Sequence, residues 1–345
     1  MRGSSCALVA SLLLVLASCS GSGPETPTER AASAAPSPSP AARCPLSGTD
    51  VPDGIDVTRP AVAVKIENNP VAYPLAGLEK AEVVYEELVE GGQTRFLALY
   101  HCTDAAKAGP IRSTRAVDPT ILADTTKILA GAGGNAIVRK VLKKAGVVIV
   151  DEEVAKDAME RISRPGVSAE HTLYGDTAEL REVGAKKFDD PPPAGVFDFG
   201  GFQGNGQKAE NITITFSPYV TVSYLWANGR WRRSDRGNPL MAEGGGRISA
   251  DNVIIEQHAV SNSTKIYDVA GNPSTEFSDK KDSGPAVVFR DGHAIRGRWV
   301  RAKDGGHVTY ETRSGREIRL HPGTTWVELV PNNKGELKGS FAFSG

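Results

Sequence analysis

Residues 81–100, AEVVYEELVEGGQTRFLALY, constrain the fold more than any other stretch because they have the pattern of two β-strands joined by Gly91 and Gly92. Glycine adopts positive φ easily, and a two-residue type I′ hairpin turn needs positive φ at both positions. Pairing outward from such a turn places Glu90 opposite Gln93 and Leu88 opposite Arg95. The sequence therefore predicts a β-hairpin with that register.

The predicted register also sets which side chains share a face, because side chains alternate across a strand. One face would carry Glu86, Leu88, Glu90, Arg95, Leu97 and Leu99. The opposite face would carry Val83, Tyr85, Glu87, Val89, Phe96 and Tyr100. Since both faces mix apolar residues with acids, we expect the hairpin at the centre of a sheet, with its charges clustered beside a cleft.

Residues 1–18 have the features of a secretory signal peptide: an early Arg2, an apolar run too short to span a bilayer, and small residues before Cys19. Residues 16–19, LASC, resemble a bacterial lipobox, and this resemblance implies cleavage before Cys19 and a diacylglycerol on its sulfur. The alternative is an ordinary signal peptide with an incidental cysteine. We expect a protein held at the extracytoplasmic face of the cell membrane by the lipid on Cys19.

The charge of the chain is nearly balanced, with 40 basic and 41 acidic residues. Nucleic acids and strongly anionic membrane surfaces select basic proteins, so neither is indicated as a partner. The six histidines are scattered without the spacing of metal ligands, and we expect no metal site.

Two of the four cysteines remain after export, because Cys6 lies in the signal and Cys19 carries the lipid. In an oxidising exported compartment, Cys44 and Cys102 most simply form a disulfide. The alternative makes Cys102 a nucleophile with His101 as its base. Adjacent residues of a strand point to opposite faces, which disfavours that pair.

Composition divides the rest of the chain into three regions. Residues 19–50 are rich in Ser, Pro and Ala and predict a disordered tether. Residues 51–195, which end near the DDPPP run at 189–193, predict an α/β or α+β N-terminal domain. Residues 207–333 contain short strands with Asn-Gly, Asp-Gly and Ser-Gly turns, and predict a mainly antiparallel β C-terminal domain. Within it, the polar segment 259–283 is expected to be a surface excursion.

Residues 126–153 predict a strand, a glycine turn, a helix and a second strand. Gly131, Gly133 and Ala136, with Asp151 further on, match the spacing of a dinucleotide-binding fingerprint. However, soluble dinucleotides are scarce outside the cell, and no second mononucleotide-binding half follows. We therefore expect glycines that only turn the chain, and no cofactor.

Charged residues gather at the ends of the predicted strands and in residues 109–115, GPIRSTR. Guanidinium groups present a planar fork of donors suited to carboxylates and phosphates. The candidate ligands in an envelope are anionic wall polymers, peptide stems and phospholipid headgroups. The same residues could instead form an internal ion-pair network that fixes the hairpin against the loop. We expect a polar cleft formed by Glu67, Asn68, Glu86, Glu90, Arg95, Arg112, Arg115 and His171.

Two functions fit these residues. The first is a binding or adaptor protein that recognises an anionic envelope ligand or a partner protein. The alternative is a cell-wall hydrolase that uses a carboxylate pair such as Glu67 and Glu86 with His171. The sequence lacks a serine nucleophile elbow, an HExxH motif and a transpeptidase cysteine signature, so we assign no catalytic residue.

Several motifs, taken in order, resemble the bacterial YerB-like lipoproteins, which carry two successive domains of unknown function named DUF3048. The motifs are RPAVAVKIEN at 59–68, YEELVEGGQTRF at 85–96, GPIRSTR at 109–115, NVII at 252–255 and PGTTWVELVP at 322–331. The resemblance implies an exported, lipid-anchored protein without an assigned reaction. At 170–174 the chain has EHTLY where the family more often has Pro-His-Asn-Leu-Tyr, so Thr172 offers no amide side chain there.

Overall fold

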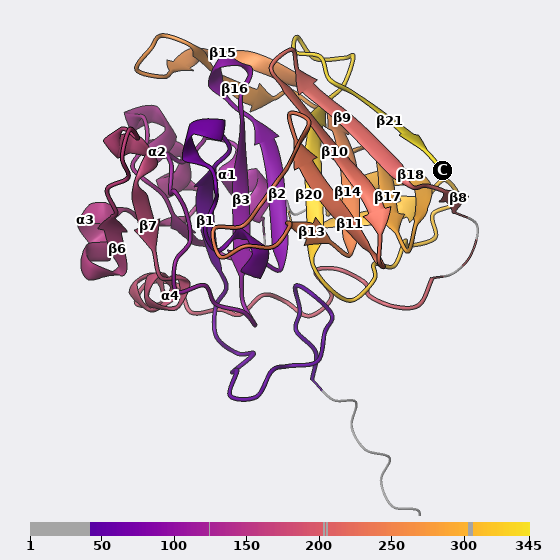
Figure 1. Cartoon of the computed structure of the whole chain (residues 1–345), viewed down its shortest axis with the longest axis horizontal. Helices are drawn as coiled ribbons and strands as arrows, with labels where there is room; N and C mark the ends of the chain where they lie inside the picture. The colour runs from indigo at the N-terminus through magenta and orange to yellow at the C-terminus, as the bar shows by residue number, and fades with distance from the viewer. Residues whose placement is uncertain (1–41, 124, 203, 205, 303–305) are drawn as a thin grey trace, which may run out of the picture. The chain divides into compact units, whose positions relative to one another are not determined.

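The computed structural model describes residues 42–345, except 124, 203, 205 and 303–305 (Figure 1). These residues belong to one compact unit. The predicted signal peptide and Cys19 lie outside the described residues. No helix in the described part of the chain is long and apolar enough to cross a membrane.

The main element is a sheet of 11 strands that draws on both halves of the sequence. The first half of the described chain is a mixed α/β region, and the second half consists mostly of antiparallel strands, as predicted. Strand β8 (Gln207–Lys208) pairs with β18 outside the main path. Along that path the order is β19 (Val308–Thr312), β18 (His293–Arg301), β17 (Ser283–Arg290), β14 (Asn252–His258), β20 (Thr325–Pro331), β2 (Val83–Leu88), β3 (Thr94–Tyr100), β1 (Val62–Glu67), β4 (Ile128–Ala130) and β5 (Val148–Val150).

Strand β20 joins the two halves, because it lies between β2 and β14 and pairs in parallel with both. We predicted two successive domains, at 51–195 and at 207–333. In the structure, strands from both of these regions belong to one sheet. The core on each face of that sheet also mixes residues of both halves, such as Phe96 with Trp326 on one face and Leu97 with Val327 on the other.

One face of the large sheet packs against a six-stranded sheet and a helix. The smaller sheet has five strands in order, with β13 (Ser249–Ala250) paired to β11, and helix α4 (Thr177–Ala185) contacts β1, β4 and β5. The strand order is β12 (Asn238–Pro239), β11 (Arg230–Asp235), β10 (Val220–Ala227), β9 (Asn211–Ser217) and β21 (Ser340–Ser344).

The opposite face packs against helices α1 (Asp118–Leu122) and α2 (Ala136–Lys144). Helix α2 begins at Asn135, whose side chain accepts a hydrogen bond from the Ile137 amide, and it buries Val138 and Leu142 one turn apart. The parallel pair β4 and β5 flanks α2 in sequence, so the predicted strand–helix–strand unit is present. Helix α3 (Glu152–Ala155) and the small sheet of β6 (Met159–Arg161) and β7 (Leu173–Gly175) complete the first half.

The β2–β3 hairpin forms, but its predicted register is wrong by one residue. The turn includes Glu90 as well as both glycines, and the Val89 amide donates to the carbonyl of Gln93. Both glycines take positive φ as expected. The larger loop places Glu87 opposite Arg95 and Glu86 opposite Phe96. Since a shift of one residue exchanges the two faces of a strand, both predicted faces are wrong.

The predicted tether is too long at its C-terminal end. Cys44 and Leu46 are buried, and the Cys44 amide and carbonyl hydrogen-bond within a turn at residues 44–49. This segment is ordered because the disulfide described below fixes it to the end of β3. Residues 19–41 of the predicted tether lie outside the described residues.

Candidate functional site

A cleft of about 720 Å³ opens where β1 ends and β3 begins. We call it the arginine cleft. Its other walls come from residues 112–115 and from the start of α2 at Gly134 and Asn135. Six of the eight predicted site residues line it: Glu67, Glu90, Arg95, Arg112, Arg115 and His171.

Glu67, the last residue of β1, is the anionic centre of one wall. Its Oε2 lies 3.0 Å from Nε of Arg112 and 2.9 Å from Nδ1 of His171. Arg112 Nη1 also lies 3.2 Å from the same His171 nitrogen, and it donates to the Glu170 carbonyl. Because Nδ1 either carries a proton or accepts one, each tautomer forms only one of its two contacts. Glu67, Arg112 and His171 therefore contact one another.

Arg115 and Glu90 form a second closed pair on the other side of the cleft. The Arg115 Nε lies 2.9 Å from Glu90 Oε2, and Ser274 donates to Glu90 Oε1 at 2.7 Å. Burial alone would raise the pKa of Glu90, but the Arg115 guanidinium and the Ser274 hydroxyl hold it below its usual range. Glu90 is thus a carboxylate that already has its partners.

Arg95 differs from the other two arginines because it has no hydrogen-bond partner among the described residues. Its side chain is 9% exposed, its Nε is buried without a partner, and its nearest carboxylate oxygen is Glu67 Oε1 at 3.7 Å. Burial, followed by the charge of Arg115, lowers the pKa of Arg95 to about 10. The guanidinium is still a cation at neutral pH. It is therefore a desolvated positive charge at the cleft.

The roof of the cleft comes from the second half of the chain. Strands β15 (Val260–Tyr267) and β16 (Pro273–Phe277) form a hairpin that lies across the end of β2 (Figure 1). Its residues Ile266, Tyr267, Asp268, Val269 and Asn272 line the cleft, and Asn135 Nδ2 donates to the Tyr267 carbonyl at 3.3 Å. We predicted this segment as a surface excursion and missed its part in the cleft, because nothing local in residues 259–283 indicates what they cover.

Asn68 and Glu86 are not part of the cleft, which corrects our prediction for both. They lie in a buried group that we call the Arg233 network. Arg233 is fully buried, and its guanidinium lies 2.6 Å from Glu86, 3.1 Å from Glu328 and 3.5 Å from Asp235. Asn68 Nδ2 donates to Glu86 Oε1 at 2.9 Å. The true hairpin register causes this placement, since it turns Glu86 to the face of Phe96, away from Glu67 and Arg95.

A third charged group lies buried beside the cleft on the face of Arg95. Lys65 pairs with Glu87 and, at 2.5 Å, with Asp118. Asp118 also accepts from the Arg115 amide at 2.6 Å, so this group fixes the backbone of the cleft wall. Burial raises the pKa of Glu87 to about 7. Lys65 and Asp118 are not among the predicted site residues; Lys65 stands in an alternation of apolar residues, which is a signal for a buried charge.

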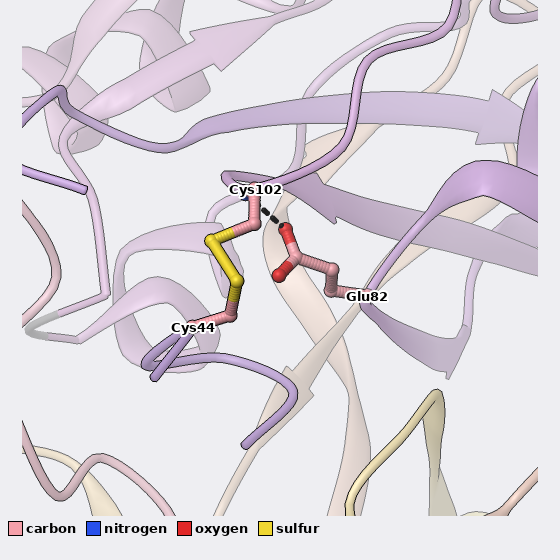
Figure 2. Close-up of side chains that lie close together, drawn as sticks. All are labelled: Cys44, Glu82 and Cys102. Atoms are coloured by element: carbon pink, nitrogen blue, oxygen red, sulfur yellow. Dashed lines mark hydrogen bonds between the residues drawn. A yellow bond between two sulfur atoms is a disulfide. The ribbon is translucent and has the colours of Figure 1, made fainter. Parts of the chain in front are cut away.

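Cys44 and Cys102 form the predicted disulfide, with their Cα atoms 6.0 Å apart (Figure 2). Glu82 lies beside them and accepts from the amides of His101 and Cys102 at 2.6 and 2.8 Å. The two sulfurs and the Glu82 carboxylate are close enough to hold a metal ion. The bond between the sulfurs removes both thiolates as ligands, however. His101 Nδ1 does lie 3.7 Å from Cys102 Sγ, closer than strand alternation predicts.

The glycines of the predicted dinucleotide fingerprint serve the arginine loop, residues 109–115. A Cβ on Gly131 would lie 2.6 Å from the Thr114 side chain, and one on Gly134 would lie 2.8 Å from it. The Thr114 amide donates to the Gly133 carbonyl. Asp151 caps α3 and pairs with Arg139 at 2.8 Å. The glycines allow close packing of Thr114, and Asp151 already has partners.

Fold and cleft together define a class of protein: a mixed α/β half and an antiparallel half that share one sheet, with a charged cleft covered by a hairpin of the second half. The chain belongs to the DUF3048 family of proteins of unknown function. The N-terminal domain of that family matches residues 46–190, and its C-terminal domain matches residues 212–327.

Two comparisons extend this relationship over most of the chain. The sequence is 25% identical over 299 residues to "Putative lipoprotein YerB" of Bacillus subtilis (strain 168), covering 84% of this chain and 86% of the relative. The fold is similar to the crystal structure of YerB protein from Bacillus subtilis, with a TM-score of 0.71 at 23% identity. That structural match covers 87% of this chain and 99% of the other.

Proposed function

We propose that this protein is a lipid-anchored envelope protein that binds an anionic ligand in the arginine cleft, with Arg95 as the principal contact. The observation that carries the proposal is the desolvated guanidinium of Arg95, which has no hydrogen-bond partner among the described residues. Burying a charged group whose donors form no hydrogen bond costs several kcal/mol, at an order of magnitude, and an anion in the cleft would supply the missing acceptor.

The surroundings of Arg95 support an anion. The start of α2 lies at the cleft through Gly134 and Asn135, and the N-terminal end of a helix is its positive end. Arg112 and Arg115 are close enough to Arg95 to lower its pKa by their charge. An anion beside Arg95 would therefore be stabilised by three guanidinium groups and a helix terminus.

The hydrolase alternative is less well supported. A carboxylate-pair mechanism needs both acids in one cleft, flanking the scissile bond. Glu67 and Glu86 face opposite sides of the sheet, and Glu86 is fully buried against Arg233. Glu67 retains His171 and Arg112 as neighbours, and the other two acids among the described lining residues, Glu90 and Asp268, already accept hydrogen bonds.

Binding is tested by pull-down from envelope extracts with the wild-type protein and with Arg95→Gln. The expected result is an anionic component that is retained by the wild type and lost from Arg95→Gln. The matched control is Arg230→Gln, which removes a guanidinium from the second sheet, far along the chain from the cleft. Retention of the same components by all three proteins would refute the proposal.

Membrane anchoring is tested separately. The proposal draws on the LASC sequence at 16–19 and on the description of the Bacillus subtilis relative as a lipoprotein. We expect Cys19→Ser to move the protein from the membrane fraction to the soluble fraction. Mass spectrometry of the wild-type N-terminal peptide should find the diacylglycerol on Cys19, and an unmodified Cys19 would contradict the anchor.

A further inference from the structure

The arginine cleft has a charge balance that limits the anion it can take. Arg112 is paired with Glu67 at 3.0 Å, and Arg115 is paired with Glu90 at 2.9 Å. Arg95 Nε is buried without a hydrogen-bond partner, and the guanidinium has only a long ion pair, 3.7 Å, to the Glu67 carboxylate that also binds Arg112. The one further acid among the described lining residues is Asp268, which is partly exposed and whose Oδ1 accepts from the amides of Ala270 and Asn272. One buried positive charge is therefore left over.

Apolar residues also line the cleft. Val89 follows β2, Val138 lies in α2, and Ile266, Tyr267 and Val269 come from the β15–β16 hairpin. Val269 is fully exposed at the hairpin tip, and Tyr267 is half exposed. Exposed apolar side chains that rim a cleft are a common feature of ligand sites, and about 720 Å³ lies in the range of small-molecule pockets.

From the charged and the apolar residues that line the cleft, we infer that the ligand is an amphipathic monoanion. Its carboxylate or phosphodiester group binds Arg95, and its apolar body lies under the β15–β16 hairpin. This inference rests on the proposed function and specifies its ligand. A single negative charge matches the one guanidinium of the three that has no hydrogen bond to a carboxylate among the described residues. A doubly charged phosphomonoester would leave one negative charge without a partner in the cleft, beside Glu67 and Glu90.

The inference is tested by calorimetric titration of the purified protein at pH 8.5, where a phosphomonoester is a dianion. The probes are octanoate, acetate, dibutyl phosphate, octyl phosphate and octanol. Octanoate or dibutyl phosphate should bind at least tenfold more tightly than octyl phosphate and acetate, and octanol should not bind. Preference for octanoate identifies a carboxylate source, and preference for dibutyl phosphate identifies a lipid headgroup source.

Two variants separate the charge from the apolar body. Arg95→Gln should weaken both monoanions at least tenfold. Val269→Ser should weaken octanoate several-fold and leave acetate unchanged, whereas Val154→Ser, at an exposed valine of α3, should change neither. Val269 makes no core contact that its loss could unfold, since it is fully exposed.

The outcomes distinguish the inference from the proposal beneath it. If no anion binds, or if Arg95→Gln binds every probe as the wild type does, the proposed function fails. If octyl phosphate binds as tightly as octanoate through Arg95, or if acetate binds as tightly as octanoate, the anion site stands and the amphipathic monoanion is refuted.

Discussion

Arg95 lies directly opposite Glu67 across the β1–β3 pair, yet its guanidinium is 3.7 Å from the nearest Glu67 oxygen and donates no hydrogen bond to it. Glu67 instead directs its other oxygen to Arg112 and His171. Arg95 therefore shares the carboxylate of its cross-strand neighbour with Arg112 and His171, and has the longest contact of the three. This relationship makes the cleft both a candidate site and a weak point in the stability of the fold.

The first prediction is that Arg95→Met stabilises the protein. The substitution removes a desolvated charge and a buried donor without a partner, and Glu67 keeps Arg112 and His171. The free energy of unfolding in urea should rise by about 1 kcal/mol. A decrease of more than about 1 kcal/mol would mean that Arg95 has a stabilising partner in the free protein.

The second prediction is that Arg233→Met has the opposite effect. Arg233 is also buried, but it pairs with Glu86, Glu328 and Asp235 and stacks on Trp326, with 4.6 Å from its guanidinium carbon to the ring centroid. Breaking a buried ion pair from one side costs about 3–5 kcal/mol. The matched control is Arg232→Met, the next residue along β11, whose side chain faces away; urea unfolding should show a change within about 0.5 kcal/mol.

The third prediction concerns the acids around Arg233. Burial and the neighbouring Glu86 raise the pKa of Glu328 well above its usual range, so burial disfavours its charged form. Glu328→Gln keeps the shape of the side chain and its hydrogen-bonding capacity, and should change the free energy of unfolding by less than about 1 kcal/mol. Glu86→Gln should cost about 3 kcal/mol, because Glu86 lies 2.6 Å from Arg233. Equal costs for the two variants would show that Glu328 is ionised.

The fourth prediction is a loss of stability at alkaline pH that depends on His258. The imidazole is stacked between Phe277 and Trp299, and its nitrogens lie 2.8 Å from Asp279 and 2.9 Å from Glu256. Burial alone would lower the pKa of His258, but these two hydrogen bonds raise it above 6.5. A raised pKa in the folded state stabilises the fold below the pKa of the unfolded chain, and this stabilisation is lost as the pH rises through the folded-state value.

The measurement for His258 is the free energy of urea unfolding from pH 6 to 9. It should fall with rising pH in the wild type, and His258→Gln should remove that part of the fall. His321→Gln, at a half-exposed histidine, is the control and should follow the wild type. The same slope in the wild type and in His258→Gln would contradict the assignment.

Local patterns were sufficient to predict much of the first half of the fold. The strand–helix–strand unit, the β2–β3 hairpin and the Cys44–Cys102 bond follow from periodicity, glycines and the redox compartment. The register failed because a turn that includes Glu90 and one that excludes it leave the same two glycines at positive φ. That single residue decided on which face Glu86 lies.

The rest of the site depends on contacts that are distant in sequence. Arg233 follows Glu86 by 147 residues, and Ser274 follows Glu90 by 184 residues. Neither β11 nor the β15–β16 hairpin carries a sequence motif that indicates which residues of the first half it contacts. The arginines and His171 could be grouped from the sequence because the arginine loop and the β2–β3 hairpin are close in sequence. The β15–β16 hairpin is distant in sequence, so only the structure shows that it covers the cleft.

The position of β20 has a consequence for how the chain is made. Residues 325–331 pair with β2 on one side and β14 on the other, so both strands have open edges until these residues have been made. Open edges invite pairing with other chains. A product that stops before residue 325 would expose two such edges and leave Glu86 and Arg233 without Glu328. The sheet is therefore complete only once β20 has been made, and chains truncated before it should be the ones that aggregate or are degraded.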